Sequence, residues 1–327
     1  MVMKRVRQAI TRELPVRGGA YTDIRELIRL RYASKAIEAF ANSKARKPLS
    51  GTLASNFRGR GIDFAEVRNY QPGDDVRTID WRVTARTGAA HTKLFQEEKE
   101  RPVLILVDQS QSMFFGSQVA FKSVLAAEVG ALLAWTALER GDRVGGVVFS
   151  EAGHRSVRPR RSKHSVLRLL HEINDFNHLL NQQPLAETNT NSLVEALRNL
   201  RRVAKHGCAV FIISDFSTLA DTGNEEARLH LNQIARQNDL VGIHISDALE
   251  RALPRPDLYT ITNGVERVRM DTADKHFRED YHRRFAEQVD ALKREFTRQK
   301  SPLLELQTHE PMISSLASKY NDYVRQA

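Results

Sequence analysis

Three short runs of Val, Ile and Leu, each followed by an aspartate, constrain the fold of this chain more than any other feature. The runs VLILVD, AVFIISD and LVGIHISD end in Asp108, Asp215 and Asp247. Apolar runs of this length are typical of strands buried on both faces of a sheet. Segments with helical spacing of apolar residues separate them, at 117–140, 163–181, 192–206 and 225–237. Strands that alternate with helices predict an α/β fold, in which a mostly parallel sheet is covered by helices on both faces.

The other patterns complete this sheet and its cover. RVGGVVFS at 143–150 predicts a further strand, with HRSVRP pairing beside it as a short hairpin. The C-terminal third predicts short strands, two helices and a last strand, at 258–262, 266–270, 274–299, 303–309 and 311–323.

The chain is expected to have three parts. Residues 21–42 have the apolar spacing of an amphipathic helix, and Pro48 and Gly51 then break the pattern. Residues 49–100 alternate short β-favouring runs with turn signals, which indicates a small antiparallel β element. We therefore expect a basic N-terminal helical segment over 1–48, the β element over 49–100 and the α/β domain over 101–327.

The net charge of +10 comes entirely from the N-terminal segment. Residues 1–60 hold 14 Lys and Arg against 4 Asp and Glu, and the rest of the chain holds 36 of each. Such a segment suits nucleic acid, an anionic membrane surface or an acidic protein, and it suits a solvated basic helix equally well. Aromatic residues are sparse there, so nucleic acid is the partner that we least expect.

Cysteine usage and hydropathy indicate the compartment. Cys208 is the sole cysteine and lies in an apolar run, which fits a reducing environment. No stretch approaches the roughly 20 apolar residues that a membrane span needs. The N-terminus is basic but lacks the apolar core of a secretory signal. We expect a soluble cytoplasmic protein without a membrane span.

Oxygen-bearing side chains follow the first two buried runs. Ser110 and Ser112 come at alternate positions after Asp108, and Asp215 ends the second run. Because neighbouring parallel strands bring their carboxyl ends to one edge of the sheet, both carboxylates are expected where open α/β sheets bind ligands. Carboxylates and hydroxyls are hard ligands suited to Mg²⁺, with Mn²⁺ as an alternative. The competing interpretation is a polar turn in which Ser112 caps the next helix.

The pattern D-x-S-x-S at 108–112 resembles the metal-ion-dependent adhesion site of von Willebrand factor A domains. In that family this motif, a threonine in a later loop and an aspartate at a later strand end surround one Mg²⁺. The resemblance implies a von Willebrand A-like, Rossmann-like fold. It also implies the metal ligands Asp108, Ser110, Ser112, Thr190 and Asp215.

Thr190 is the family's loop threonine by position, since it precedes the helical pattern SLVEAL. A glycine pair usually comes before that threonine, whereas Thr188 and Asn189 stand here, and the spacing to the helix is slightly longer. Thr188 is therefore the competing ligand.

The block FAEVRNYQPGDDVRTIDWRVTARTG at 64–88 is similar to the signature of a bacterial family catalogued as domain of unknown function 58. Its members combine this block with a von Willebrand A-like domain and commonly accompany MoxR-type AAA+ ATPases. The resemblance covers about Ser50 to Phe216 in specific motifs. It implies a chaperone-like cofactor or adaptor of such an ATPase, which acts in the assembly or maturation of other proteins.

The same block supplies candidate partner-binding residues. It is dense in charged and aromatic side chains, of which we select Arg68, Asp74, Asp75, Arg77 and Trp81. The competing interpretation is an internal salt-bridge network that ties the β element to the sheet, with Trp81 packed between them.

The sequence gives no sign of catalysis. The histidines are scattered, and there is no H-E-x-x-H pattern, P-loop lysine motif or G-x-S-x-G elbow. We therefore expect an interaction module, in which a client or the ATPase supplies an acidic residue to the bound Mg²⁺. The alternatives are a Mg²⁺-dependent phosphoryl hydrolase and a binder of nucleic acid or anionic surfaces through the basic N-terminus.

Overall fold

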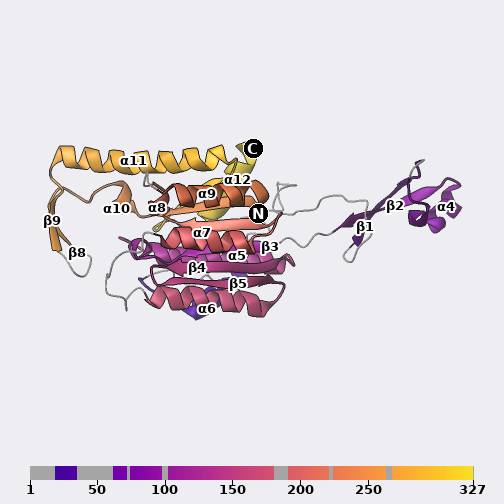
Figure 1. The fold of residues 1–327 in the computed structure, drawn as a ribbon, viewed down its shortest axis with the longest axis horizontal. Coiled ribbons are helices and arrows are strands. Elements are labelled where there is room, and N and C mark those ends of the chain that lie inside the picture. Colours follow the sequence, from indigo (N-terminus) through magenta and orange to yellow (C-terminus); the bar gives the residue numbers. More distant parts are fainter. Residues whose placement is uncertain are drawn as a thin grey trace, which may run out of the picture. The chain divides into compact units, whose positions relative to one another are not determined.

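A six-stranded sheet in the order β10–β7–β6–β3–β4–β5 forms the centre of the larger part of the chain (Figure 1). In this computed structural model the described residues are 19–34, 62–71, 74–97, 102–179, 191–220, 224–262 and 267–326. The strands are β3 (Pro102–Asp108), β4 (Arg143–Ser150), β5 (Gly153–Arg160), β6 (Ala209–Ser214), β7 (Asp239–Ser246) and β10 (Leu303–Gln307). All neighbours pair in parallel except β5, which runs antiparallel to β4. The prediction of a mostly parallel sheet is confirmed.

Helices cover both faces of this sheet, as predicted (Figure 1). They include α5 (Lys122–Glu139), α6 (Lys163–Leu179), α7 (Ser192–Val203) and α9 (Glu225–Gln237). On one face Gly130 of α5 lies against Val107 of β3 and Ile173 of α6. On the other face Leu104 and Leu106 join a buried cluster with α7 and α9. Because successive side chains of a strand point to opposite faces, β3 contributes to both layers.

The described part of the N-terminal segment packs on the α5–α6 face. Helix α2 (Ile24–Arg29) begins after Asp23, whose side chain accepts a hydrogen bond from the backbone N–H of Arg25. The indole Nε1 of Trp135 donates to the carbonyl of Leu27 over 3.1 Å, which fixes the helix on α5. Residues 35–42 of the helix expected over 21–42 lie outside the described residues.

The chain divides into two compact units, Arg46–Arg101 and the remainder. In the smaller unit β1 (Ile62–Asn69) pairs antiparallel with β2 (His91–Glu97), as expected. Between them lie η1 (Val76–Thr78) and the helix α4 (Trp81–Thr87), where short strands were expected. The side chain of Asp80 caps the N-terminus of α4, and Gly88 ends it at a φ of 74°. These two capping signals outweigh the β propensity of the residues between them.

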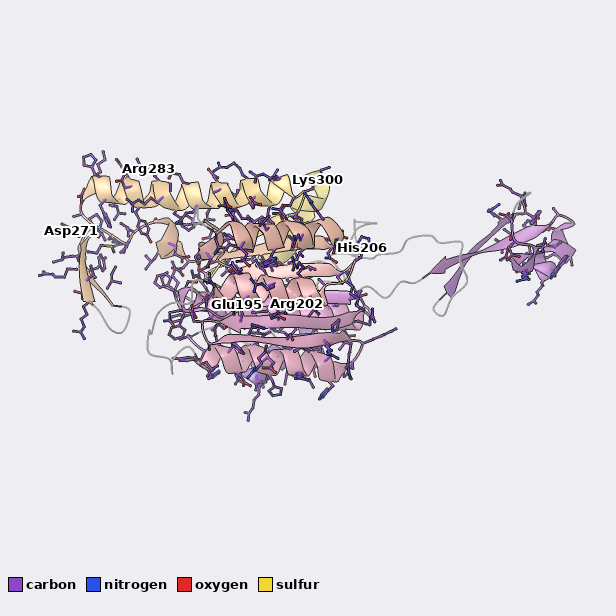
Figure 2. The ribbon with its side chains drawn as sticks, viewed as in Figure 1. Glu195, Arg202, His206, Asp271, Arg283 and Lys300 are labelled. Atoms are coloured by element: carbon purple, nitrogen blue, oxygen red, sulfur yellow. The ribbon has the colours of Figure 1, made fainter. Side chains whose placement is uncertain are left out.

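The C-terminal third follows the predicted order. It contains α8 (Ser217–Ala220), α10 (Ala248–Arg251), β8 (Leu258–Thr262), β9 (Arg267–Asp271), α11 (Lys275–Arg298) and α12 (Met312–Gln326). Strands β8 and β9 form an antiparallel pair. Charged side chains such as Arg283 project from α11 into solvent, whereas Phe296 near its end is buried (Figure 2). None of the helices in the described ranges is long and apolar enough to cross a membrane.

Candidate functional site

Asp108 is the last residue of β3, and its side chain is almost fully buried, with 4% exposed. Its Oδ1 accepts a hydrogen bond from the backbone N–H of Ser110 over 2.8 Å. Its Oδ2 accepts one from the Ser214 hydroxyl over 2.5 Å. Because Ser214 is the last residue of β6, this second bond joins the ends of two neighbouring strands.

Asp215 directly follows β6, so it reaches the same edge of the sheet as Asp108. Val107 and Ile213 are partners in the parallel β3–β6 register, which places Ser214 opposite Asp108 and Asp215 one residue beyond it. Oδ1 of Asp215 accepts from the backbone N–H of Ser217 over 3.0 Å. The sequence prediction that Asp108 and Asp215 lie on adjacent parallel strands is therefore confirmed.

The serines of the D-x-S-x-S motif connect the two carboxylates. The hydroxyls of Ser110 and Ser112 lie 3.1 Å apart, and Ser112 is near enough to Asp215 to lower the pKa of that carboxyl group. Ser112 lies within the short helix η2 (Gln111–Met113), whereas Phe121 occupies the N-cap position of α5. The competing interpretation of Ser112 as the cap of the next helix is therefore wrong.

The loop that carries the threonine candidates lies outside the described residues. Thr188 and Thr190 both fall in that gap, so the choice between them stays a prediction. The helix expected after them is present, since α7 begins at Ser192.

The two carboxylates have opposite electrostatic surroundings. Burial raises the pKa of Asp108 above its usual range, and the negative charge of Asp215 raises it further. Burial alone would also raise the pKa of Asp215, but the Lys122 ammonium lowers it below its usual range. At neutral pH Asp215 is therefore ionised, and Asp108 is the carboxyl group that readily exchanges a proton.

Lys122 is the functional residue that the sequence analysis missed. Its ammonium lies 2.9 Å from Oδ2 of Asp215 and 2.5 Å from Oε1 of Glu250, and only 2% of its side chain is exposed. The available signal was a lysine among the apolar residues at the start of a buried helix, in FKSVLAAEV. A lysine in that position needs buried anionic partners.

The third strand-end aspartate, Asp247, has a different role. Its carboxylate accepts hydrogen bonds from the hydroxyls of Ser117 and Thr308, both over 2.5 Å, and from the backbone of Leu249. Its own N–H donates to Glu250, so it completes a capping box for α10. Asp247 therefore ties together the loop after β3 and the end of β10.

Backbone strain occurs beside the carboxylates. Phe216 adopts a φ of 53°, in the left-handed region that residues other than glycine rarely occupy. Its ring is 1% exposed and meets that of Phe296 at a centroid distance of 5.4 Å. Strained residues are concentrated at functional sites, where packing holds them in place.

The donor set suits a small hard cation. Two carboxylates and two hydroxyls converge at one edge of the sheet, and all four are oxygen ligands of the kind that Mg²⁺ and Mn²⁺ prefer. No group of three or more His, Cys, Asp or Glu residues in the described ranges could hold a metal ion. A cation here would therefore depend on the serine hydroxyls and on water, and Asp215 is already paired with Lys122.

Comparison with known proteins establishes the family. Residues 66–291 match the family described as "Protein of unknown function DUF58". The chain belongs to this family. An uncharacterized protein of Mycobacterium bovis and one of Mycobacterium tuberculosis are each 28% identical over 295 residues, which is 88% of this chain and 88% of each relative. The Bacillus subtilis protein YeaD is 37% identical over 75 residues, or 21% of this chain and 19% of its own.

A solved structure also aligns with the DUF58 chain. It is the conserved hypothetical protein BatB from Bacteroides thetaiotaomicron, which is 12% identical. The alignment covers 69% of this chain and 99% of that one, with a TM-score of 0.37. A score this low does not support a conclusion about the fold.

The candidate partner-binding residues lie in the smaller unit, near the start of the DUF58 match. Arg68 pairs with Asp74 over 2.7 Å, and Asp75 caps η1. Arg77 is exposed, and 70% of Trp81 is exposed. The smaller unit by itself therefore does not bury Trp81, and the assignment of these residues to a partner stays a prediction.

Proposed function

We propose that this DUF58 chain is a non-enzymatic interaction module with a von Willebrand A-like fold and a Mg²⁺-dependent adhesion-type site. The observation that carries the proposal is the succession of polar side chains Asp108, Ser110, Ser112 and Asp215 at one edge of the parallel sheet, in which Asp108 binds Ser110 and Ser110 binds Ser112. Carboxylate and hydroxyl groups in this order are the metal ligands that the resemblance to the adhesion site implies.

The residues of the chain have distinct tasks in this proposal. Asp108 supplies the direct carboxylate, with the hydroxyls of Ser110 and Ser112 beside it. Lys122 keeps Asp215 ionised and oriented. Thr190, or Thr188 in its place, completes the ligand set from the neighbouring loop.

A Mg²⁺ ion, or Mn²⁺ in its place, would retain positive charge at such a site and favour one further anionic oxygen. We infer that this oxygen comes from an Asp or Glu of another protein. The resemblance of block 64–88 to proteins that accompany MoxR-type AAA+ ATPases suggests that this partner is such an ATPase or its client. The chain would then act in the cytoplasm as a cofactor or adaptor in assembly or maturation.

Thermal unfolding in Mg²⁺, in Mn²⁺ and in EDTA tests the metal site. A specific cation stabilises the native state by about 2–3 kcal/mol at a hundredfold excess over its Kd. Asp108→Asn keeps the side-chain volume and removes the negative charge, so this variant should lose the metal-dependent shift. Asp290→Ala removes an exposed carboxylate of α11 and should keep the shift. A shift that persists in Asp108→Asn contradicts the proposed site.

Affinity capture with the full chain as bait tests the partner. A MoxR-type ATPase should be retained in Mg²⁺, released by EDTA and absent with Asp108→Asn. Retention that is unaffected by EDTA would show that the metal site is not the binding surface.

A further inference from the structure

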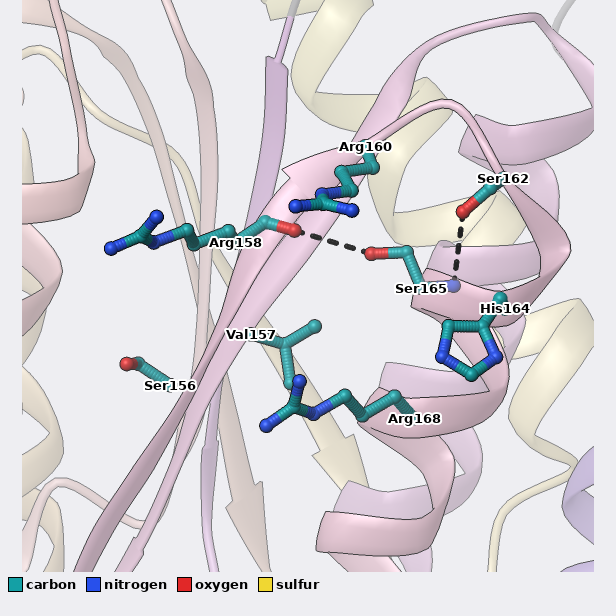
Figure 3. A pocket seen from close by; sticks show the side chains of 8 residues that line it. All are labelled: Ser156, Val157, Arg158, Arg160, Ser162, His164, Ser165 and Arg168. Atoms are coloured by element: carbon teal, nitrogen blue, oxygen red, sulfur yellow. Dashed lines mark hydrogen bonds between the residues drawn. The ribbon is translucent and has the colours of Figure 1, made fainter.

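A pocket of about 360 Å³ opens beside the edge strand β5, between that strand and the first turns of α6 (Figure 3). Its lining includes Arg158 and Arg160 from β5, and His164 and Arg168 from α6. No carboxylate lines it. The volume is at the lower end of the range for small-ligand sites, which is roughly 300–1,000 Å³.

This pocket lies at the opposite end of the sheet from the carboxylates. Asp108 pairs with Phe149 in the β3–β4 register, and Phe149 pairs with His154 at the start of β5. Arg160, at the other end of β5, pairs with Val144 near the start of β4. The pocket is therefore separate from the proposed metal site, and its function does not depend on that site.

Positive charge is concentrated around the pocket. Residues 153–168 contain five arginines and one lysine and no Asp or Glu, although residues 61–327 as a whole hold 36 basic and 36 acidic residues. The described structure gives no ion pair for Arg158 or Arg160. Arg168 lies 3.9 Å from Glu172, and its side chain is 62% exposed. In the described part of the chain no carboxylate therefore neutralises Arg158 or Arg160, and like charges held together repel one another.

The backbone around the pocket is held in place. The Ser165 hydroxyl donates to the carbonyl of Arg158 over 3.2 Å and to that of Val144 over 2.9 Å, which joins α6 to the two outer strands. The Ser162 hydroxyl oxygen accepts from the N–H of Ser165 over 3.2 Å, which leaves its own proton free to donate (Figure 3). Arg160 of β5 and Arg168 of α6 thus border one space whose backbone walls are fixed, whereas the side chain of Arg158 extends away from α6 (Figure 3).

We propose that this pocket binds the phosphate group of a small ligand, either inorganic phosphate or a nucleotide. The guanidinium group is a planar fork that binds phosphate oxygens in pairs, and the two groups of Arg160 and Arg168 match the two negative charges of a phosphate monoester. The positive end of the α6 dipole, at Lys163, adds a smaller attraction in the same direction.

Isothermal titration calorimetry on the full chain tests this proposal, with inorganic phosphate and AMP as probes and adenosine as the probe without phosphate. All titrations are run in chloride at one ionic strength, so that general screening is constant. The wild type should bind phosphate or AMP saturably at one site. Arg160→Gln and Arg168→Gln should each weaken binding roughly tenfold, because each removes a charge-assisted hydrogen-bond donor pair.

Arg155→Gln is the matched control. Arg155 is exposed on the same strand and carries the same charge, but it does not line the pocket. This variant should bind within roughly twofold of the wild type, since it removes only a distant charge. Tighter binding of AMP than of phosphate assigns the ligand to the nucleotides, and equal binding assigns it to free phosphate.

Three results would overturn the proposal. The first is an absence of saturable heat with both phosphate and AMP. The second is an equal loss in Arg155→Gln and Arg160→Gln, which would indicate attraction to overall charge. The third is adenosine binding as tightly as AMP, which would mean that the phosphate group is not recognised. The substituted side chains are exposed, so unchanged thermal midpoints will show that each variant is folded.

Discussion

The Nζ atom of Lys122 lies 2.9 Å from Oδ2 of Asp215, and both side chains are nearly inaccessible to solvent. The same ammonium group binds Glu250. One cation inside the molecule therefore holds together the end of β6, the start of α5 and the helix α10. This arrangement makes the stability of the edge of the sheet dependent on a single side chain.

Replacement of Lys122 by Met should destabilise the protein strongly. Removal of one partner from a buried ion pair leaves an uncompensated charge and costs about 3–5 kcal/mol. The free energy of unfolding from urea denaturation measures the loss. Lys275→Met is the matched control, because Lys275 is exposed and pairs with Glu279 only at 3.7 Å, so its loss should cost less than about 1 kcal/mol. Equal losses of unfolding free energy in the two variants would show that the buried ion pair stabilises the protein no more than the exposed one.

Ser214→Ala should weaken the candidate metal site as well as the fold. The Ser214 hydroxyl donates to Asp108 and accepts from the N–H of Phe216 over 2.9 Å, and it lowers the pKa of Asp108. Loss of a hydrogen bond to a buried charged group costs about 1.5–3 kcal/mol. Because the pKa of Asp108 rises further in the variant, cation binding at neutral pH should also weaken. Urea denaturation with and without Mg²⁺ measures both effects.

The control for this experiment is Ser318→Ala. The Ser318 hydroxyl is exposed and bonds only to a helix carbonyl, so its loss should change the free energy of unfolding by less than about 0.5 kcal/mol. A Ser214→Ala variant that matches this control would contradict the role assigned to Ser214.

The free energy of unfolding should decrease as the pH is lowered from about 6.5 to about 4, because of His244. Burial lowers the pKa of His244 to about 4 from the ordinary value of 6.5, despite the opposing charge of Asp215. In that window the unfolded chain binds a proton that the folded chain excludes, so the free energy of unfolding decreases by up to about 1.4 kcal/mol per pH unit.

His244→Asn isolates this contribution. The difference in free energy of unfolding between wild type and variant should change across that window and be constant on either side. The carboxyl groups titrate in both proteins, so their contribution cancels in this difference. His276→Asn, at an exposed position of α11, should leave the pH profile unchanged. A wild-type profile that runs parallel to that of His244→Asn would show that His244 has the same pKa in the folded and the unfolded chain.

Gly242→Ala should destabilise the contact between β7 and α11. A Cβ atom at this position would collide with the ring of Phe296 and the side chain of Leu303. Overpacking of a core in this way costs about 1–3 kcal/mol. The double variant Gly242→Ala/Phe296→Leu should recover part of the loss relative to the sum of the single variants. If the losses of unfolding free energy in the two single variants add up to the loss in the double variant, the collision with Phe296 is not the cause of the destabilisation.

The sequence was sufficient to predict the strands and the meeting of Asp108 with Asp215. Both follow from local rules, since apolar runs give buried strands and parallel neighbours share one carboxyl edge. The helix α4 was missed because Asp80 and Gly88 act as caps within a β-favouring stretch. Lys122 could not be assigned, because its partners Asp215 and Glu250 lie 93 and 128 residues away in the chain. Such pairings depend on tertiary packing, which spacing along one segment does not encode.

Phe216 connects the direction of a carboxylate to a helix at the surface. Its ring is wedged against Phe296 of α11, and its strained backbone directly follows Asp215. The backbone that carries Asp215 therefore cannot shift unless the ring withdraws, and withdrawal would open the packing under α11. A ligand that needs this backbone in another position must loosen that helix, whereas a ligand that accepts the existing position binds without rearrangement.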